Sequence, residues 1–301
     1  MNRAGIDIGS NTLLLVVVDA AGAILHDEAR VVGLGRGLGD RGVLSPERFA
    51  AAEEVLRAFV LTAKRHGIEA WAIKAVATSA ARRAMNAATF FERVQRETGL
   101  RVRIVTGEEE AHLTWLGAQR DLSPQPPLLV VDLGGGSTEL VLGERDRIFH
   151  RVSLEIGTVR LSETFLCGRN GEVPDRFDPG QVSQLRKRVE IELEKVRLDP
   201  LPRTVVGIAG TVTTLTAMQL GLTSYDGARV HGSTLERVDL ARWTDRLLAA
   251  DAATRRQLAA VSPERADWLL TGAIILARVL AAAKRPSLVA SDRGLRFGLL
   301  T

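Results

Sequence analysis

The same short pattern occurs near the start of the chain and again near its middle, and it restricts the available folds more than any other feature. In each copy an aspartate lies near the end of a strand-like run, a glycine-containing turn follows, and a second strand-like run comes next. A single copy is typical of an ordinary hairpin, because glycine, serine and asparagine favour turns. Two copies, one heading each half, indicate an architecture built twice. The four runs are residues 4–8, 13–19, 128–132 and 138–142, and the aspartates are Asp7 and Asp132.

The rest of the chain alternates short β-branched runs with longer helical patterns, which predicts an α/β fold. At 301 residues, and with roughly 150 residues per domain as a guide, we expect two domains. Three prolines between residues 122 and 127 indicate a linker. We therefore expect domains at 1–121 and 122–301, with the last helical segment a candidate to pack back on the first domain. Further strands are expected at residues 71–77, 102–106, 152–154, 204–208 and 288–291, and helices at 46–66, 86–98, 108–119 and 179–196.

Composition excludes several classes of protein. An apolar content of 46% is ample for packed cores and argues against disorder. The longest strongly apolar tract, residues 268–283, contains Arg278 and is shorter than the ~20 residues that a membrane helix needs. The net charge is +4 and aromatic residues make up only 4% of the chain, so platforms for stacking bases are scarce. We expect no membrane and no nucleic-acid partner.

The single cysteine, Cys167, excludes an intrachain disulfide and a zinc site built from several cysteines. The first seven residues are too short a lead into Asp7 to hold the apolar centre of a signal peptide. Both observations favour a cytoplasmic protein.

Both turns carry residue types that suit phosphate. A glycine lets the backbone approach a ligand closely, and a run of glycines lets successive backbone N–H groups converge on an anion. The first turn adds three hydrogen-bonding side chains after its glycine, and the second adds a serine and a threonine. The candidate phosphate-binding residues are Gly9, Ser10, Asn11, Thr12, Gly135, Gly136, Ser137 and Thr138.

Two groups of carboxylates are candidates for catalysis and metal binding. Glu108, Glu109 and Glu110 begin a predicted helix, where acids are a common solvated face. Neighbouring acids also raise one another's pKa, which suits a base that acts on water. Asp132 and Glu139 flank the glycine turn and can face the same side across a hairpin. Carboxylate oxygens with intervening water are what Mg²⁺ prefers; Asp7 is the corresponding acid of the first turn.

Several segments, taken in order along the chain, resemble the Ppx/GppA family of exopolyphosphatases and guanosine pentaphosphate phosphohydrolases. The resemblance covers essentially the whole chain, and the combination of a glutamate run with a triple-glycine loop is specific. Longer members carry additional C-terminal helical domains, so the chain resembles the short two-domain form. The segments are residues 77–82, 107–111, 132–139, 207–211, 265–267 and 291–296.

The resemblance implies a fold and a set of roles. The fold is the two-lobed actin-like α/β fold (ASKHA, ribonuclease H-like), with the active site in the cleft between the lobes. Glu110, with Glu109 as second choice, would direct water at the terminal phosphate, and Arg82 would neutralise the transferred group. Asp132, Glu139 and Asp7 would hold Mg²⁺, with Mn²⁺ or K⁺ as alternatives. Gly157 matches a family segment near the phosphates.

The implied substrates are inorganic polyphosphate and guanosine pentaphosphate, the latter giving the tetraphosphate, and a homodimer is an open alternative to a monomer. Two other functions stay open. A kinase of the same superfamily would need an adenine pocket, for which Gly207–Thr211 is the corresponding loop; that loop is equally well explained as a packing turn. A slow or non-catalytic sensor of polyphosphate or guanosine tetraphosphate would not need the glutamates.

Overall fold

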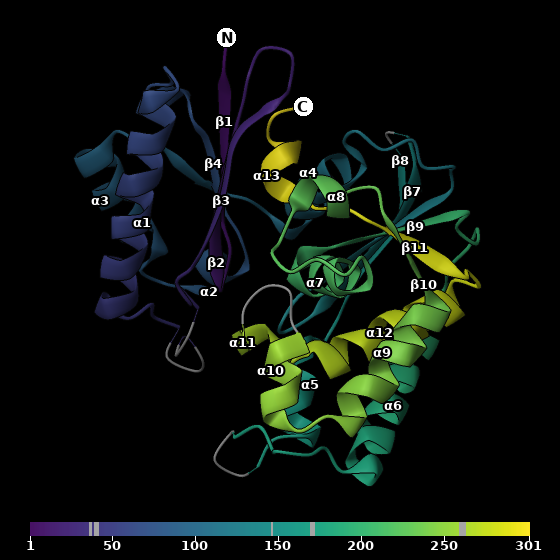
Figure 1. The fold of residues 1–301 in the computed structure, drawn as a ribbon. Coiled ribbons are helices and arrows are strands. Elements are labelled where there is room, and N and C mark those ends of the chain that lie inside the picture. The colour runs from purple at the N-terminus through teal and green to yellow at the C-terminus, as the bar shows by residue number, and fades with distance from the viewer. Residues whose placement is uncertain (36–37, 39–41, 146, 169–171, 259–262) are drawn as a thin grey trace. The chain divides into compact units, whose positions relative to one another are not determined.

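The computed structural model describes residues 1–35, 38, 42–145, 147–168, 172–258 and 263–301. The chain divides into two compact units, one formed by Met1–Gly117 with Leu295–Thr301 and the other by Ala118–Gly294 (Figure 1). The expected boundary after residue 121 lies four residues beyond the observed division, and the last seven residues join the first unit. They do so because their apolar side chains are buried against strands of that unit.

The first unit is a five-stranded sheet in the order β3-β2-β1-β4-β5. Strand β2 is antiparallel to both of its neighbours, β1 and β3, whereas β4 and β5 run parallel to β1. The strands are β1 (Arg3–Ile8), β2 (Thr12–Val18), β3 (Ile24–Val31), β4 (Lys74–Ala77) and β5 (Val102–Ile104). The helices are α1 (Pro46–Arg65), the 3₁₀ turn η1 (Ala70–Ala72), α2 (Ser79–Arg83), α3 (Ala87–Thr98), α4 (Gly107–Gln119) and α13 (Leu295–Gly298).

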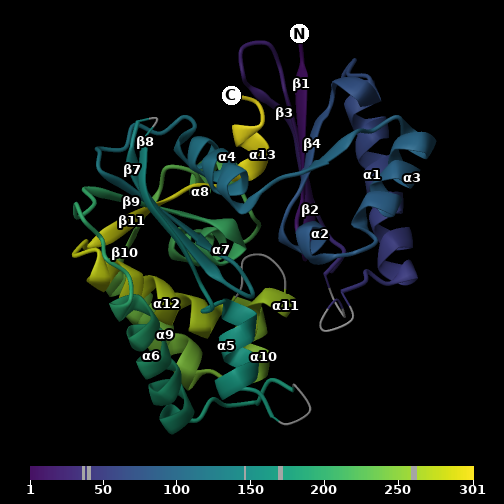
Figure 2. The same cartoon turned by 180° about the vertical axis from the view of Figure 1, so that it is seen from behind.

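Helices cover both faces of this sheet (Figures 1 and 2). On one face the core is formed by alternate residues of β1 and the apolar sides of α1 and α3, including Ile6, Phe59 and Phe90. On the other face Val76 and Val105 pack against the C-terminal segment, as do Val16 and Val18 in a neighbouring cluster. Because both faces are buried, β2 is apolar at every position after Thr12 rather than alternating. Strand β1 instead alternates its apolar residues with Arg3, Gly5 and Asp7.

The second unit is built on a six-stranded sheet in the order β10-β11-β9-β6-β7-β8. Helices α6, α9 and α12 pack together on one side of it, with α12 in contact with both others (Figure 2). The strands are β6 (Leu128–Leu133), β7 (Thr138–Glu144), β8 (Arg147–Leu154), β9 (Thr204–Ile208), β10 (Thr234–Glu236) and β11 (Ser287–Ala290). The helices are α5 (Thr158–Phe165), α6 (Pro179–Glu194), α7 (Ala209–Gln219), α8 (Gly227–Val230), α9 (Arg237–Ala249), α10 (Ala252–Leu258), α11 (Pro263–Ala266) and α12 (Leu269–Ala282).

The two sheets repeat one topology. The order β3-β2-β1-β4-β5 has its counterpart in β8-β7-β6-β9-β11, with the same antiparallel and parallel pairings, and β10 is an additional edge strand. The predicted α/β class with two lobes is therefore confirmed. Within the part of the chain that the structure describes, no helix is both long and apolar enough to cross a membrane.

Three strands differ from the prediction. Strands β3 and β10 were not expected, and β8 begins five residues before the predicted start at residue 152. All three are edge strands of their sheets and most of their residues are exposed or half-buried. Such strands carry charged residues in place of the apolar run or strict alternation that marks a buried strand, so the sequence signal is weak.

Candidate active site

The first hairpin turn, Gly9–Thr12, is closed by a hydrogen bond from the Gly9 N–H to the Thr12 carbonyl, 3.1 Å long. The carbonyls of Ser10 and Asn11 point toward residues 32–35, whose N–H groups donate to them over 2.7 to 2.9 Å. Among the described residues, no acceptor meets the N–H groups of Ser10 and Asn11. The side chains of Ser10, Asn11 and Thr12 make no hydrogen bond there either. The turn therefore presents unengaged donors.

The second turn, residues 134–137, has the same length and the same closing bond, from the Gly134 N–H to the Ser137 carbonyl at 3.0 Å. Its carbonyls point toward the start of α5. The N–H groups of Thr158, Val159 and Arg160 donate to the carbonyls of residues 134 and 135 over 2.9 to 3.0 Å. The first N–H groups of a helix have no partner inside it, so this loop and α5 satisfy one another.

Gly157 must be glycine because of this packing. A Cβ at that position would lie 2.3 Å from the Gly135 carbonyl oxygen and from the Gly136 carbonyl carbon. Both are backbone atoms, which cannot move aside without displacing the loop. At Gly136 a Cβ would meet nothing within 4 Å. Glycine at position 136 is therefore not needed to avoid a clash. Its lack of a side chain leaves open space over the loop.

Asp132 and Glu139 are direct partners in the register of β6 and β7, so their side chains lie on the same face of the sheet, as expected. Glu139 Oε1 accepts hydrogen bonds from the hydroxyls of Ser137 at 2.6 Å and Ser153 at 2.8 Å. Thr138 differs from its predicted role in phosphate binding. Its side chain is fully buried and its hydroxyl donates to the Ile156 carbonyl, so it supports the loop.

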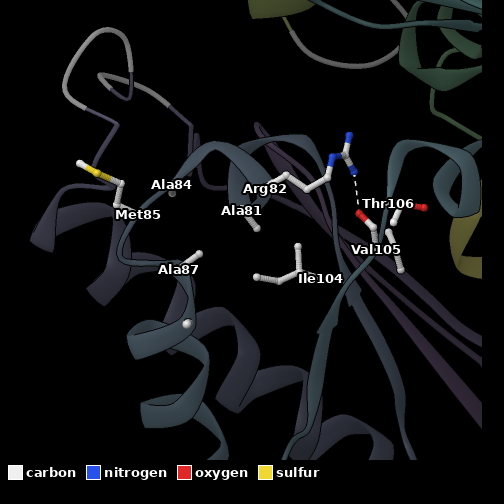
Figure 3. Close-up of a pocket in the computed structure, with 9 residues that line it drawn as sticks. Ala81, Arg82, Ala84, Met85, Ala87, Ile104, Val105 and Thr106 are labelled. Carbon is white, nitrogen blue, oxygen red and sulfur yellow. Dashed lines mark hydrogen bonds between the residues drawn. The ribbon is translucent and has the colours of Figure 1, made fainter.

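In the first unit, Arg82 and Glu110 form an ion pair. Arg82 Nη1 donates to Glu110 Oε2 over 2.6 Å and to the Val105 carbonyl over 2.9 Å. The two side chains remain 31% and 30% exposed, so both are accessible to a ligand. Arg82 also borders a surface pocket of about 440 Å³ whose walls are largely alanine and branched aliphatic side chains (Figure 3). Arg82 is the charged member among the described residues that line it.

The three consecutive glutamates do not share one environment. Thr106 caps the start of α4, since its hydroxyl accepts from the Glu109 N–H and its carbonyl from the Glu110 N–H. The Glu109 carboxylate pairs with Arg103 of β5, whereas that of Glu110 pairs with Arg82. Only Glu110 is also close enough to Asp7 to perturb its titration. The structure therefore groups Glu110, Arg82 and Asp7, and separates Glu109 from them.

The titration of the Asp7 carboxyl is strongly perturbed by its surroundings. Its Oδ1 is shielded from solvent and has no hydrogen-bond partner among the residues that the structure describes. Burial, and next the charge of Glu110, raise the pKa of Asp7 to about 7, while the positive charge of Arg296 opposes the shift. Arg296 is itself held by two hydrogen bonds to Asp27 of β3, at 2.9 and 2.8 Å. A buried oxygen without a donor is costly, and a cation would relieve that cost.

The residues present fit a magnesium ion of the loosely held kind. Within the described ranges, no group of three or more His, Cys, Asp or Glu residues is arranged to enclose a metal. Mg²⁺ commonly needs only one or two carboxylates, with water and substrate phosphates completing its shell. Asp132 beside Glu139 offers such a pair, and the unpartnered Asp7 Oδ1 offers a single oxygen.

Two residues near the second loop were not among the predicted site residues. Ser153 donates to Glu139, and Arg160 Nε donates to the Gly136 carbonyl over 2.7 Å. The Gly207–Thr211 loop is tightly packed at its first glycine, because a Cβ at Gly207 would lie 3.0 and 3.1 Å from the two methyl carbons of Val212. Burial and the acids Glu163 and Asp267 raise the pKa of the Cys167 thiol, which disfavours the reactive thiolate.

Comparisons with known proteins agree with one another. A model of the Ppx/GppA phosphatase family matches residues 15–301. Exopolyphosphatase 2 of Mycobacterium tuberculosis is 37% identical over 287 residues, which cover 91% of this chain and 88% of that protein. A crystal structure of the Aquifex aeolicus Ppx/GppA phosphatase superposes with a TM-score of 0.86 at 34% identity, covering 100% of this chain and 98% of the other. An exopolyphosphatase structure from Cytophaga hutchinsonii gives 0.85 at 25% identity, covering 100% and 96%. The chain belongs to the Ppx/GppA phosphatase family.

Proposed function

We propose that the chain is an exopolyphosphatase, which uses water to release the terminal orthophosphate of inorganic polyphosphate. The observation that carries the proposal is the loop 134–137, where three successive N–H groups lack a protein acceptor among the described residues. Converging N–H groups bind anions. The named relatives from Mycobacterium tuberculosis and Cytophaga hutchinsonii are exopolyphosphatases. The lone cysteine fits action in the cytoplasm.

The first unit is assigned the work on water. Glu110 takes a proton from a water molecule while the oxygen of that water attacks the terminal phosphorus. The bond from this phosphorus to the bridging oxygen breaks, and the shortened chain leaves with the bridging oxygen. Arg82 moves from Glu110 to the oxygens of the transferred group, which releases the carboxylate and stabilises the spreading charge. The exposure of both side chains supports this exchange, because neither is locked in a closed pair.

The second unit is assigned the hold on phosphate. The N–H groups of Gly135, Gly136 and Ser137 bind phosphate oxygens. In the first unit, Ser10, Asn11 and Thr12 of the first turn are also assigned to phosphate binding. Asp132 and Glu139 would hold Mg²⁺, and in the first unit the Asp7 carboxylate is a further candidate ligand for a cation or its water. When bound, Mg²⁺ supplies charge neutralisation on the phosphates. Glu139 is kept in place by Ser137 and Ser153.

Guanosine pentaphosphate is the second proposed substrate, because the assigned residues act on terminal phosphates and make no demand on the other end of the molecule. Phosphate release under Mg²⁺ from inorganic triphosphate, long-chain polyphosphate and guanosine pentaphosphate tests both proposals. We expect release from the inorganic chains. Binding without release from any substrate would identify a sensor instead, and phosphate transfer from ATP to an acceptor would identify a kinase.

A further inference from the structure

Arg160, on the first turn of α5, is joined to the second loop by two hydrogen bonds. Its backbone N–H donates to the Gly135 carbonyl at 3.0 Å and its side-chain Nε to the Gly136 carbonyl at 2.7 Å. The other end of the guanidinium is held by Glu155, with 2.8 Å between Nη1 and Oε2. The side chain thus spans from an exposed carboxylate to the backbone of the loop.

These bonds determine which way the loop N–H groups point. In a planar trans peptide unit, the carbonyl of one residue and the N–H of the next point in opposite directions. The carbonyls of residues 134, 135 and 136 are all drawn toward α5. The N–H groups of residues 135, 136 and 137 therefore point away from α5, side by side, as in an anion-binding nest.

The three peptide units are not held equally. Backbone N–H groups of α5 hold the carbonyls of Gly134 and Gly135, and almost any residue at those helix positions could supply them. The Gly136 carbonyl accepts from the Arg160 side chain, and no other described residue donates to it. The direction of the Ser137 N–H therefore depends on the identity of residue 160.

We propose that Arg160 is a positioning residue for phosphate binding, which holds the Gly136–Ser137 peptide so that the Ser137 N–H faces the bound phosphate. The inference rests on the proposed function of the loop. Arg160 is 49% exposed and Glu155 71% exposed, and exposed ion pairs add little to stability. Replacing Arg160 therefore changes the loop without unfolding the unit.

The test compares Arg160→Gln and Arg160→Lys with Arg203→Gln. Arg203 is also exposed, but it lies just before the first residue of β9. The last residue of β9, Ile208, is the one that pairs with Asp132 next to the loop. Its replacement removes the same charge and leaves the loop alone. Lysine keeps the charge at position 160 and loses the fixed planar donor. Equilibrium binding of inorganic triphosphate, KM, kcat and thermal unfolding are measured for each variant.

Loss of a hydrogen bond to a charged ligand predicts a rise of about tenfold to a hundredfold in KM and in the dissociation constant of triphosphate for Arg160→Gln. We expect kcat to stay within about threefold and lysine to restore only part of the affinity. Full restoration by lysine, or an equal effect of Arg203→Gln, would show a role of charge alone and overturn the inference.

The binding measurement separates this inference from the proposed function. If the parent protein binds triphosphate and releases no phosphate, the proposed activity fails while the effect of Arg160 on binding still decides the inference. If the parent does not bind triphosphate, the loop is no phosphate site and the inference fails as well. If Arg160→Gln lowers the unfolding temperature, the binding of triphosphate by Arg160→Lys is compared with that of the parent instead.

Discussion

The two hairpin turns have one design and different surroundings. Each has four residues and the same closing hydrogen bond. In each, carbonyls of the turn accept hydrogen bonds from the segment that follows the third strand of that sheet. The residue opposite the aspartate differs: Leu14 faces Asp7, whereas Glu139 faces Asp132. The supporting segment differs too, being irregular at residues 32–35 and helical in α5. A shared scaffold can therefore present similar backbone donors with unlike chemistry around them.

The difference indicates a division of labour. The aspartate of the first unit has an unpartnered buried oxygen and lies near the Arg82 and Glu110 pair. The aspartate of the second unit has an acidic neighbour that is held by two serine hydroxyls. A carboxylate near a partly exposed ion pair suits proton transfer, and a fixed pair of carboxylates suits a cation. Each of the following predictions tests one side of this contrast.

Glu110→Gln is expected to have the largest effect. The variant keeps the size of the side chain and removes the base, and general-base catalysis is typically worth about 10² to 10⁴ in rate. We expect kcat for triphosphate to fall by that factor while binding of triphosphate stays equal or tightens, because a negative charge facing an anion is gone. The matched control is Glu109→Gln, whose carboxylate pairs with Arg103 instead. A large fall in the control with a normal rate in Glu110→Gln would transfer the role to Glu109.

Asp7→Asn should change how stability depends on pH. The folded protein binds the Asp7 proton more tightly than the unfolded chain does, since the pKa rises from 3.8 to about 7. The contribution is present below pH 3.8 and is lost as pH rises through about 7, so the free energy of unfolding falls across that window. At about 1.4 kcal/mol per pKa unit the loss is at most about 4 kcal/mol.

Chemical unfolding at pH 5 and pH 8, in the presence of EDTA so that no cation binds the carboxylate, measures this dependence. Asp7→Asn is expected to lose the fall and to be the more stable protein at pH 8. Glu54→Gln, which removes an exposed carboxylate from α1 of the same unit, should keep it. The same fall in Asp7→Asn as in the parent would place the titration on another group.

Gly157→Ala and Gly136→Ala test two properties of the second loop separately. The first disturbs the packing that holds the loop in place, and the second fills the open space where phosphate is proposed to bind. The first methyl group meets loop backbone at 2.3 Å and the second meets nothing within 4 Å. Overpacking of this kind costs about 1 to 3 kcal/mol, so Gly157→Ala should lower the unfolding temperature. Gly136→Ala should unfold like the parent and yet bind triphosphate more weakly. Equal binding in Gly136→Ala and the parent would mean that phosphate does not rest on the loop.

The sequence predicted the features that depend on neighbouring residues. Both hairpins and the pairing of Asp132 with Glu139 follow from a glycine turn between two apolar runs, and the register follows from the turn length. The contact between Arg82 and Glu110 joins residues 28 apart, and the bond from Arg160 to Gly136 joins residues 24 apart. No local pattern encodes such contacts. The return of the last helical segment to the first domain was raised from the sequence only as a candidate, because it depends on packing of residues 295–301 against β2, β4 and α4.

His231→Gln is expected to give the smallest effect, with a pH dependence opposite to that of Asp7. In the second unit, burial and next the positive charge of Arg293 lower the pKa of His231. The ring nitrogens lie 3.1 Å from the Arg120 carbonyl and 3.3 Å from the Ser291 hydroxyl.

The unfolded chain therefore takes up the His231 proton first as pH falls below about 6.5, and stability declines with decreasing pH. Hydrogen exchange of peptides from β9 and β11 at pH 5.5 and 7.5 measures this decline in stability in the second unit alone. We expect the parent to lose protection at pH 5.5 relative to pH 7.5, and His231→Gln to lose less. His150→Gln, on the exposed edge strand β8, is the control; if it abolishes the decline and His231→Gln does not, the acid sensitivity of this unit belongs to its edge and not to the carboxyl end of β11.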